Sequence, residues 1–371
     1  MRKKTFVQPL LFVLFVLLLL GGCDREPQPI KLGLSINLSG LGGEAGEQIR
    51  DGALLAVDAV NSQGGINGRP LELLVRDDEN SDEGIARADQ SLINEGVVAI
   101  VGHSYSSTTV KAYPLVMKNE VLLITAYTGT GSLSGKDDFF FRTAVDTTLY
   151  GEKVAALLNE KKISSVSFLM DMSNPAFVVD YKEKTERNFS GRVTEVRFDS
   201  KQENDWQQIV ADLMVSDPDA IIFLTEASMT GVALQKLASS GYDGLRIATL
   251  WAQTPGLMRY AGGAVEGLLV VSFINPDNHS PQWLEFSEKM EAQFKKKATA
   301  RSGRACELVM ILADALRRCS VITPAELKKA LLAGEYQTLM GQVRFDSFGD
   351  VNRPVYQIIV RDGAFHTVKE L

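Results

Sequence analysis

A regular alternation of short apolar runs with longer amphipathic stretches is the feature that most constrains the fold. Residues 30–36 predict a strand, and residues 44–61 predict a helix because apolar side chains recur there every three or four positions. Further strands are expected over 71–75, 97–101 and 121–124, with helices over 82–95 and from the segment after residue 101 to residue 117. Strands that alternate with helices form a parallel sheet covered on both faces, so an α/β protein is predicted.

A second series of the same kind follows. Strands are expected over 166–170, 193–198, 220–224, 245–250 and 267–272, with helices over 149–162, 177–189, 205–215 and 230–240. Three successive helices (about 281–297, 303–318 and 324–333) precede closing strands over 343–345, 355–360 and 365–368. A chain of 371 residues exceeds the size at which one core usually stops growing. Two lobes are therefore predicted, each a mostly parallel sheet flanked by helices.

The N-terminus has the features of an export signal. Basic residues at 2–4 precede an uninterrupted apolar run over 10–20, which is shorter than the roughly 20 residues of a membrane-spanning helix. The segment ending in Gly22-Cys23 resembles the lipobox of bacterial lipoproteins, whose cysteine becomes the lipidated first residue; an ordinary signal peptide with an unmodified cysteine is the alternative. We expect a signal peptide over 1–22, a lipidated tether over 23–29 and membrane anchoring through the acyl chains. Asp24 resembles an inner-membrane retention signal, so the expected location is the periplasmic side of the cell envelope.

The charge argues against a nucleic-acid-binding protein, and the cysteine content argues against a protein stabilised by disulfides. Removal of residues 1–22 takes away three basic residues and no acidic one, which changes the formal charge from -7 to -10. A chain this acidic is not expected to bind nucleic acid. Cys306 and Cys319 bracket one predicted helix and would lie about 20 Å apart, too far for a disulfide. Free buried thiols are expected instead.

A glycine-rich loop raises the possibility of a nucleotide cofactor. The segment Gly40-Leu-Gly-Gly-Glu-Ala45 fits the G-x-G-x-x-A pattern of dinucleotide-binding turns. That pattern also requires an acidic residue roughly 20 positions further on. The acidic residues at the end of the second predicted strand, Asp77-Asp78, lie more than 30 positions after Gly42, which is too far for the pattern. No cofactor is therefore expected.

A second motif suggests hydrolysis. Gly102-His-Ser-Tyr-Ser106 nearly matches the nucleophile elbow G-x-S-x-G, with Ser104 as the nucleophile and His366 as a possible base. Ser106 replaces the glycine that allows the sharp turn, and none of the three histidines neighbours a carboxylate at a recognisable spacing. Three dispersed histidines also predict no metal site. A serine esterase remains the weaker alternative.

Hydroxyl groups gather at two expected strand ends. Residues 106–109 read Ser-Ser-Thr-Thr at the start of a predicted helix, and residues 125–132 read Thr-Ala-Tyr-Thr-Gly-Thr-Gly-Ser. A helix N-terminus binds anions through its free N–H groups, whereas simple capping accounts for one hydroxyl only. Ligands of open α/β sheets lie beyond the carboxyl ends of the strands. The two loops therefore predict one anion-binding crevice.

Motifs along the whole mature chain resemble the type I periplasmic binding proteins, specifically the leucine/isoleucine/valine-binding group of ABC importers. The segments that carry this resemblance are 51–61, 64–70, 77–78, 101–107, 261–262, 266–267 and 341–346 with Gly349. The resemblance implies a two-lobed fold with a three-strand hinge, its crossovers near Asp146, Phe273 and Arg344. Lobe 1 would comprise 30–145 plus 274–343, and lobe 2 would comprise 146–273 plus 344–371. It also implies a monomer that is not an enzyme.

The resemblance further implies roles for residues of both crevice loops. Ser106 matches the serine whose hydroxyl and amide bind an amino-acid carboxylate. The second loop matches the one that supplies a carbonyl for the ammonium and a second hydroxyl; the family's threonine falls on Gly129, so Thr128 and Thr130 remain alternatives. The ligand contacts expected from the first lobe are Ser106, Ser107, Tyr127, Thr128 and Gly129.

Several positions depart from the family's pattern. An aromatic residue of the first loop is replaced by Ala45, and the acid that pairs with the ammonium falls around Trp251. Glu226 is a candidate replacement for that acid, because an unpaired buried carboxylate is costly; an exposed glutamate is the alternative. Ala45, Glu226 and Trp251 complete the expected site. Branched-chain specificity does not follow from the resemblance.

These observations predict an extracytoplasmic lipoprotein that captures an amino acid or related small carboxylate. It would deliver this ligand to the permease of an ABC importer. A ligand-sensing receptor module without transport is the alternative that uses the same fold.

Overall fold

The computed structural model describes residues 27–371. The predicted signal peptide, Cys23 and most of the predicted tether lie outside these residues. Within them, no helix combines the length and the apolar character needed to cross a membrane.

The first lobe is built on a five-stranded parallel sheet with the order β2-β1-β3-β4-β5. Its strands are β1 (Ile30–Ile36), β2 (Leu71–Asp77), β3 (Ala99–Gly102), β4 (Leu122–Thr125) and β5 (Phe140–Arg142). Its helices are α2 (Gly43–Ser62), α3 (Asp82–Asn94), α4 (Ser106–Lys118), α10 (Pro281–Phe294), α11 (Ala300–Arg318) and α12 (Pro324–Leu332). The hairpin β11 (Glu335–Thr338) and β12 (Gly341–Arg344) and the short turns η1 (Gly40–Gly42) and η2 (Gly131–Leu133) complete it.

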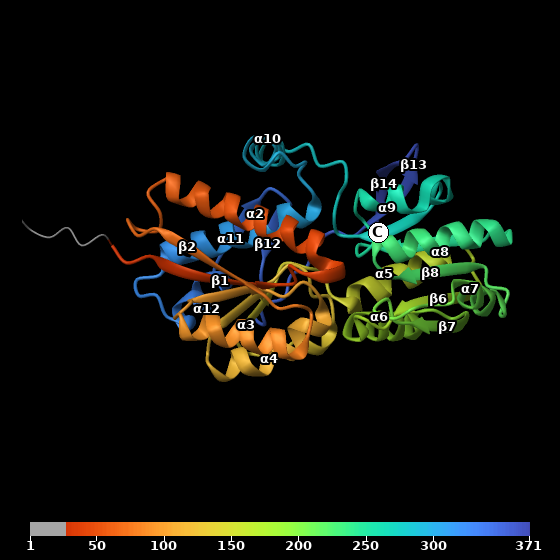
Figure 1. The fold of residues 1–371 in the computed structure, drawn as a ribbon, viewed down its shortest axis with the longest axis horizontal. Coiled ribbons are helices and arrows are strands. Elements are labelled where there is room, and N and C mark those ends of the chain that lie inside the picture. Colours follow the sequence, from red (N-terminus) through yellow and green to blue (C-terminus); the bar gives the residue numbers. More distant parts are fainter. Residues whose placement is uncertain (1–26) are drawn as a thin grey trace, which may run out of the picture.

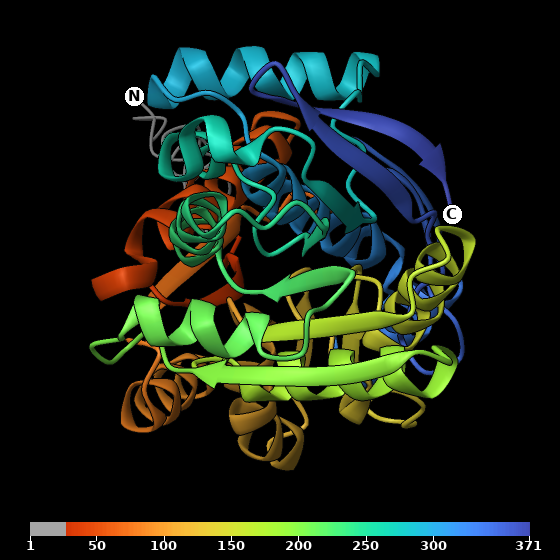
Figure 2. The same ribbon diagram turned by 90° about the vertical axis from the view of Figure 1, so that its right-hand side faces the viewer.

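The second lobe contains a seven-stranded sheet with the order β14-β13-β10-β9-β8-β6-β7. Its strands are β6 (Ser165–Asp171), β7 (Arg192–Phe198), β8 (Ala220–Leu224), β9 (Leu245–Thr249), β10 (Leu269–Ser272), β13 (Tyr356–Arg361) and β14 (Ala364–Glu370). Its helices are α5 (Thr147–Glu160), α6 (Pro175–Asn188), α7 (Trp206–Met214), α8 (Ala227–Ser240), α9 (Gly256–Ala261) and the short η3 (Gly262–Val265). Five strands are parallel, whereas β13 runs antiparallel to both of its neighbours. β7 and β14 form the two edges (Figure 2).

The two sheets lie side by side along the long axis of the molecule (Figure 1). The chain passes between them three times: from β5 to α5, from β10 to α10 and from β12 to β13. This arrangement confirms the predicted α/β architecture with two lobes.

Apolar strand residues form the core of both lobes. β4 is buried throughout, and so are β6 and β8, which fits strands covered by helices on both faces. In the first lobe α2 and α11 approach unusually closely: a Cβ atom at Gly52 would lie 2.0 Å from the carbonyl oxygen of Ser302. Glycine at this position therefore brings the N-terminal end of α11 close to α2.

Some expected bounds were wrong for local reasons. The helix expected over about 281–297 ends at Phe294, because Lys295 adopts a left-handed conformation with φ 57°. The helix expected from 303 begins at Ala300, where Thr299 caps it by accepting a hydrogen bond from the Ser302 amide. The short strands β5 and β11 were not expected. Cys306 and Cys319 are free and buried, as predicted.

Candidate ligand-binding cleft

Loops at the carboxyl ends of strands from both lobes line one cleft. The loops after β3 and β4 meet those after β8 and β9 there, as expected for an open α/β sheet. An inner cavity of about 40 Å³ lies between Tyr105, Tyr127, Asn174, Trp251 and Arg304. Two outer compartments adjoin it. The α9 compartment has a volume of about 430 Å³ and the η1 compartment about 320 Å³.

Aromatic side chains form the apolar walls of the inner cavity. Tyr105 of the first lobe packs edge-on against Trp251 of the second, with 6.1 Å between ring centroids. Phe177, at the start of α6, packs against the same indole at 6.0 Å. Tyr105 and Trp251 also line the η1 compartment, so they separate it from the inner cavity.

Two arginines near the N-terminal end of α11 supply positive charge to the cleft. Arg301 forms a 3.2 Å salt bridge across the cleft with Glu226, which follows β8. Arg304 lies deeper: its guanidinium donates to the carbonyls of Ala126 and Ala300 and stacks 4.6 Å from the Tyr127 ring centroid. Burial lowers the pKa of Arg304 to about 10. The group therefore remains a buried cation at neutral pH.

Glu226 has a cationic partner within the chain itself. Burial raises the pKa of Glu226, whereas the charge of Arg301 lowers it. The sequence suggested that a carboxylate at this position pairs with a cationic group of the ligand. In the structure Arg301 is that cationic partner.

The hydroxyls of the two predicted crevice loops bond mainly to each other and to the opposite lobe. The Ser106 Oγ accepts hydrogen bonds from the amides of Gly129 and Thr130, at 3.0 and 3.3 Å. The Ser107 amide donates to the Asn174 side chain, and its Oγ accepts from the Ala176 amide, each at 3.0 Å. Ser106 thus joins the two loops, and Ser107 joins the two lobes.

The structure brings together some of the predicted site residues. Tyr127, Gly129 and Trp251 line the inner cavity, while Ala45 and Glu226 line the α9 compartment. Ser106, Ser107 and Thr128 are buried outside these linings. The Thr128 hydroxyl is 2.6 Å from that of Thr109.

Sequence reasoning missed further residues of the inner cavity. Those with aromatic, amide or charged side chains are Tyr105, Asn174, Phe177, Arg301 and Arg304. The two arginines did leave a signal, because they lie three positions apart in the first turns of a helix. The helix dipole disfavours cations at this end, so a pair of arginines there indicates another role.

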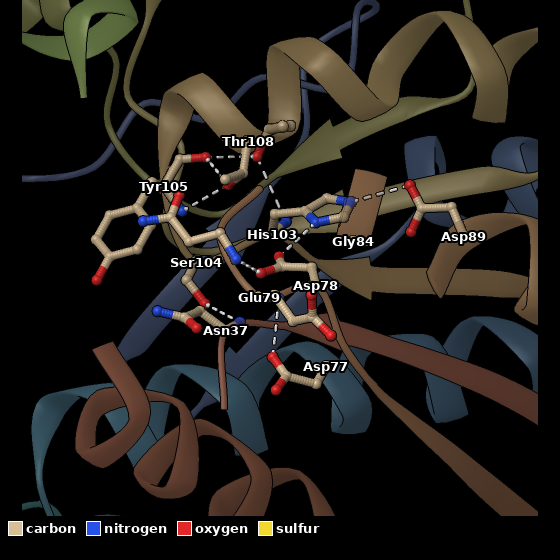
Figure 3. A network of polar contacts seen from close by, with 12 residues as sticks. Asn37, Asp77, Asp78, Glu79, Gly84, Asp89, His103, Ser104, Tyr105 and Thr108 are labelled. Atoms are coloured by element: carbon tan, nitrogen blue, oxygen red, sulfur yellow. Dashed lines mark hydrogen bonds and ion pairs between the residues drawn. The ribbon is translucent and has the colours of Figure 1, made fainter. Parts of the chain in front are cut away.

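A buried network behind the β3 loop corrects one sequence inference. No histidine neighbours a carboxylate at a recognisable spacing in the sequence, yet the His103 Nδ1 is 2.9 Å from Asp78 and its Nε2 is 3.2 Å from Asp89 (Figure 3). All three side chains are fully buried. Burial alone would lower the pKa of His103, but the charge of Asp89 and hydrogen bonds to both carboxylates outweigh it and raise the pKa to about 10. The spacings of 25 and 14 residues hid this cluster.

The same network bears on the esterase alternative. Ser104 Oγ accepts a hydrogen bond from the Asn37 amide at 3.2 Å, and both ring nitrogens of His103 face aspartates. His366 is exposed on β14, an edge strand of the other sheet. The structure does not bring the proposed base to Ser104.

Comparisons with known proteins agree with this fold. Residues 29–364 match the family described as periplasmic binding protein. The leucine-, isoleucine-, valine-, threonine- and alanine-binding protein of Pseudomonas aeruginosa is 23% identical over 361 residues, which cover 95% of each chain.

Solved structures share the architecture at low sequence identity. The branched-chain amino acid binding protein of Streptococcus pneumoniae with isoleucine has a TM-score of 0.83 and 20% identity, covering 93% of this chain and 100% of that one. A solute-binding protein of Rhodopseudomonas palustris with p-hydroxybenzoic acid has a TM-score of 0.83 and 19% identity, covering 93% and 97%. These structures share the fold, and the match over residues 29–364 shows that the chain belongs to the periplasmic binding protein family.

Proposed function

We propose that this protein captures an amino acid or a related small carboxylate between its lobes and delivers it to an ABC permease. The observation that carries the proposal is the cleft itself, in which loops at strand ends of both lobes enclose a cavity with aromatic walls and two arginines. Membership of the periplasmic binding protein family supports a solute-binding role. One relative is named for leucine, isoleucine, valine, threonine and alanine, and two structural neighbours contain isoleucine and p-hydroxybenzoic acid, so the family alone does not select the ligand.

In this proposal the hydroxyl-rich loops of the first lobe hold the carboxylate end of the ligand. The bonds from Gly129 and Thr130 to Ser106 support this role, because they order both loops beside the cavity. The remaining proposed contacts are Ser107, Tyr127, Thr128, Ala45, Trp251 and Glu226. The proposed lobes are 30–145 plus 274–343 and 146–273 plus 344–371.

The proposal also covers the location of the protein. After removal of residues 1–22, Cys23 would carry the lipid and residues 23–29 would tether a monomer to the periplasmic side of the membrane, the inner one if Asp24 acts as a retention signal. Mass spectrometry of the N-terminal peptide from the native host tests this. A Cys23→Ala variant that stays membrane-bound would contradict it.

A ligand screen tests the function. Binding to the folded state alone raises the melting temperature, so a thermal-shift screen of amino acids and small organic acids on the mature protein should identify the ligand. Loss of uptake of that ligand in a deletion strain would demonstrate transport. Uptake at the normal rate would instead favour a sensor.

Ser106→Ala tests the site. We expect it to weaken ligand binding by about 1–3 kcal/mol, because the buried amides of Gly129 and Thr130 lose their acceptor and the loop loses its order. Calorimetric titration measures the change, with the exposed Ser239→Ala as the matched control. Equal affinity of the Ser106 variant and the unaltered protein would contradict the assignment.

A further inference from the structure

The lining of the inner cavity includes one buried hydrogen-bond donor that lacks an acceptor. The indole Nε1 of Trp251 is buried and has no hydrogen-bond partner among the described residues. The Asn174 side chain uses its oxygen to accept from the Ser107 amide, and no bond is found there for its nitrogen. Both residues are at least nine-tenths buried. An unpaired buried donor is unfavourable unless a ligand supplies the acceptor.

Arg304 adds a positive charge that forms no direct pair with a carboxylate of the described residues. Its side chain is buried, with 5% of the residue exposed, and it forms no salt bridge with any residue from 27 to 371. Its bonds to Ala126 and Ala300 go to neutral carbonyl oxygens. A buried cation without a counter-charge is costly, so Arg304 favours an anion in the adjoining cavity.

Two acidic groups near the inner cavity already have cationic partners. Glu226 pairs with Arg301, and Glu307, which follows Arg304 by one helical turn, pairs with Arg353 at 2.9 Å. No acidic residue lines the inner cavity. Of the acids that line the outer compartments besides Glu226, Glu79 pairs with Arg87, and Glu44 is exposed to solvent.

Two backbone carbonyls beside the inner cavity already accept a hydrogen bond from the chain itself. The carbonyl of Ala126 accepts from Arg304, and that of Gly129 accepts from the Thr147 amide at 2.7 Å. A zwitterionic ligand would therefore place its ammonium beside guanidinium groups, with no carboxylate in the lining of the inner cavity to pair with it.

Resting on the proposed function, we propose that the solute is a small monocarboxylate with an apolar body and no free ammonium group, whose carboxylate Arg304 binds. Trp251 and Asn174 donate hydrogen bonds to the carboxylate in addition to those of the hydroxyl-rich loops, and Tyr105 and Phe177 contact the apolar body. A monoanion neutralises the inner cavity, whereas a zwitterion leaves it with the charge of Arg304. The present inner volume of about 40 Å³ holds only about three water molecules, so the solute enters when the lobes separate.

Matched ligand pairs test this on the unaltered mature protein. Calorimetric titration compares leucine with 4-methylpentanoate and phenylalanine with 3-phenylpropanoate; each acid differs from its amino acid only by loss of the ammonium group. A third compound, 3-phenylpropylamine, keeps an ammonium group and lacks the carboxylate. We expect each acid to bind at least tenfold more tightly than its amino acid, and the amine not to bind.

The outcomes separate the two proposals. An amino acid that binds as tightly as its deaminated partner, or more tightly, would overturn the monocarboxylate inference and leave the solute-binding function intact. If no carboxylate in these pairs or in the wider screen binds, both proposals fail.

Substitution of Arg304 tests the residue. Arg304→Gln should lower the affinity for the acid at least tenfold and reduce the preference for acid over amino acid toward unity, and Arg304→Lys should retain part of both. Arg318→Gln is the matched control, since Arg318 lies at the other end of α11 and pairs with Asp314. A preference that survives in Arg304→Gln would overturn the assignment. If that variant does not fold, the comparison of the ligand pairs on the unaltered protein still tests the preference for a monocarboxylate over an amino acid.

Discussion

At the residue scale, His103 is held as a cation by two buried carboxylates. It directly follows β3, and the loop that it begins leads through Ser104 to the N-terminus of α4. Breaking a buried ion pair by removing one partner typically costs 3–5 kcal/mol. We therefore assign His103 to the stability of the loop that carries the cleft residues, rather than to catalysis.

His103 should make stability depend on pH. Its pKa of about 10 in the folded protein exceeds the ordinary value of 6.5, so the folded state binds the proton more tightly. The stabilisation is complete below about pH 6.5 and is lost as the pH rises toward 10, with a slope of up to about 1.4 kcal/mol per pH unit. Urea unfolding across this range should show a shallower decline for His103→Gln than for the unaltered protein.

The pH experiment has an internal control. His366→Gln removes an exposed histidine and should leave the profile unchanged. At pH 6 the His103→Gln variant should also be less stable by about 3–5 kcal/mol, because Asp78 and Asp89 lose their shared cation. Parallel profiles for His103→Gln and the unaltered protein would exclude the proposed role of this histidine.

At the element scale, α11 connects the first-lobe core to the cleft. Its middle packs into the core of the first lobe, while its first turns carry Arg301 and Arg304. Two features fix the position of this end: the close approach of Gly52 to Ser302, and the capping box in which Thr299 and Ser302 bond each other's amide. The position of both guanidinium groups therefore depends on how this helix starts.

Two cap substitutions separate helix stability from ligand binding. Thr299 caps α11 and Thr323 caps α12, each by accepting from a backbone amide three residues on. Each change to alanine should lower the free energy of unfolding by about 0.5–2 kcal/mol. Only Thr299→Ala should also weaken binding of the ligand, because α12 contributes no residue to the cleft linings. Urea unfolding and calorimetric titration measure the two effects; equal affinities in both variants would count against this role of α11.

At the scale of the whole molecule, the lobes contact each other across the cleft. The salt bridge of Arg301 with Glu226 and the bonds from Ser107 to Asn174 and Ala176 span the interface. Closure of lobes around a ligand is a common hinge motion. The inner cavity is small in this structure, so the solute enters only when the lobes separate. The contacts between the lobes oppose this separation.

Removing one interlobe contact should favour opening. Glu226→Gln deprives Arg301 of its counter-charge, so the ligand-free variant should have a larger radius of gyration than the unaltered protein in small-angle X-ray scattering. Saturating ligand should bring the two values together. Glu160→Gln, which removes an exposed pair with Lys369 within the second lobe, should have no effect. If Glu226→Gln has the radius of the unaltered protein, the salt bridge does not hold the lobes together.

Most elements could be predicted from the sequence, because burial of one face leaves a local period of apolar residues. Two short strands were missed: β5 has only three residues, and the four residues of β11 include no apolar run of the kind that marks β3 and β4. The hydroxyl loops at the ends of β3 and β4 could also be located. Their bonding could not, since the acceptor of the Gly129 amide lies 23 positions away, in Ser106.

The sequence by itself therefore determined the α/β architecture, its two lobes and the strand ends at which ligands are expected, because these follow from local patterns of burial and turn residues. Only the tertiary structure decided which groups meet in the cleft. Arg304 is 178 positions from the carbonyl of Ala126 that it contacts, and Arg301 is 75 positions from Glu226. Charge balance in a buried cavity depends on such distant partners, and it is this balance that changes the expected ligand from an amino acid to a simple carboxylate.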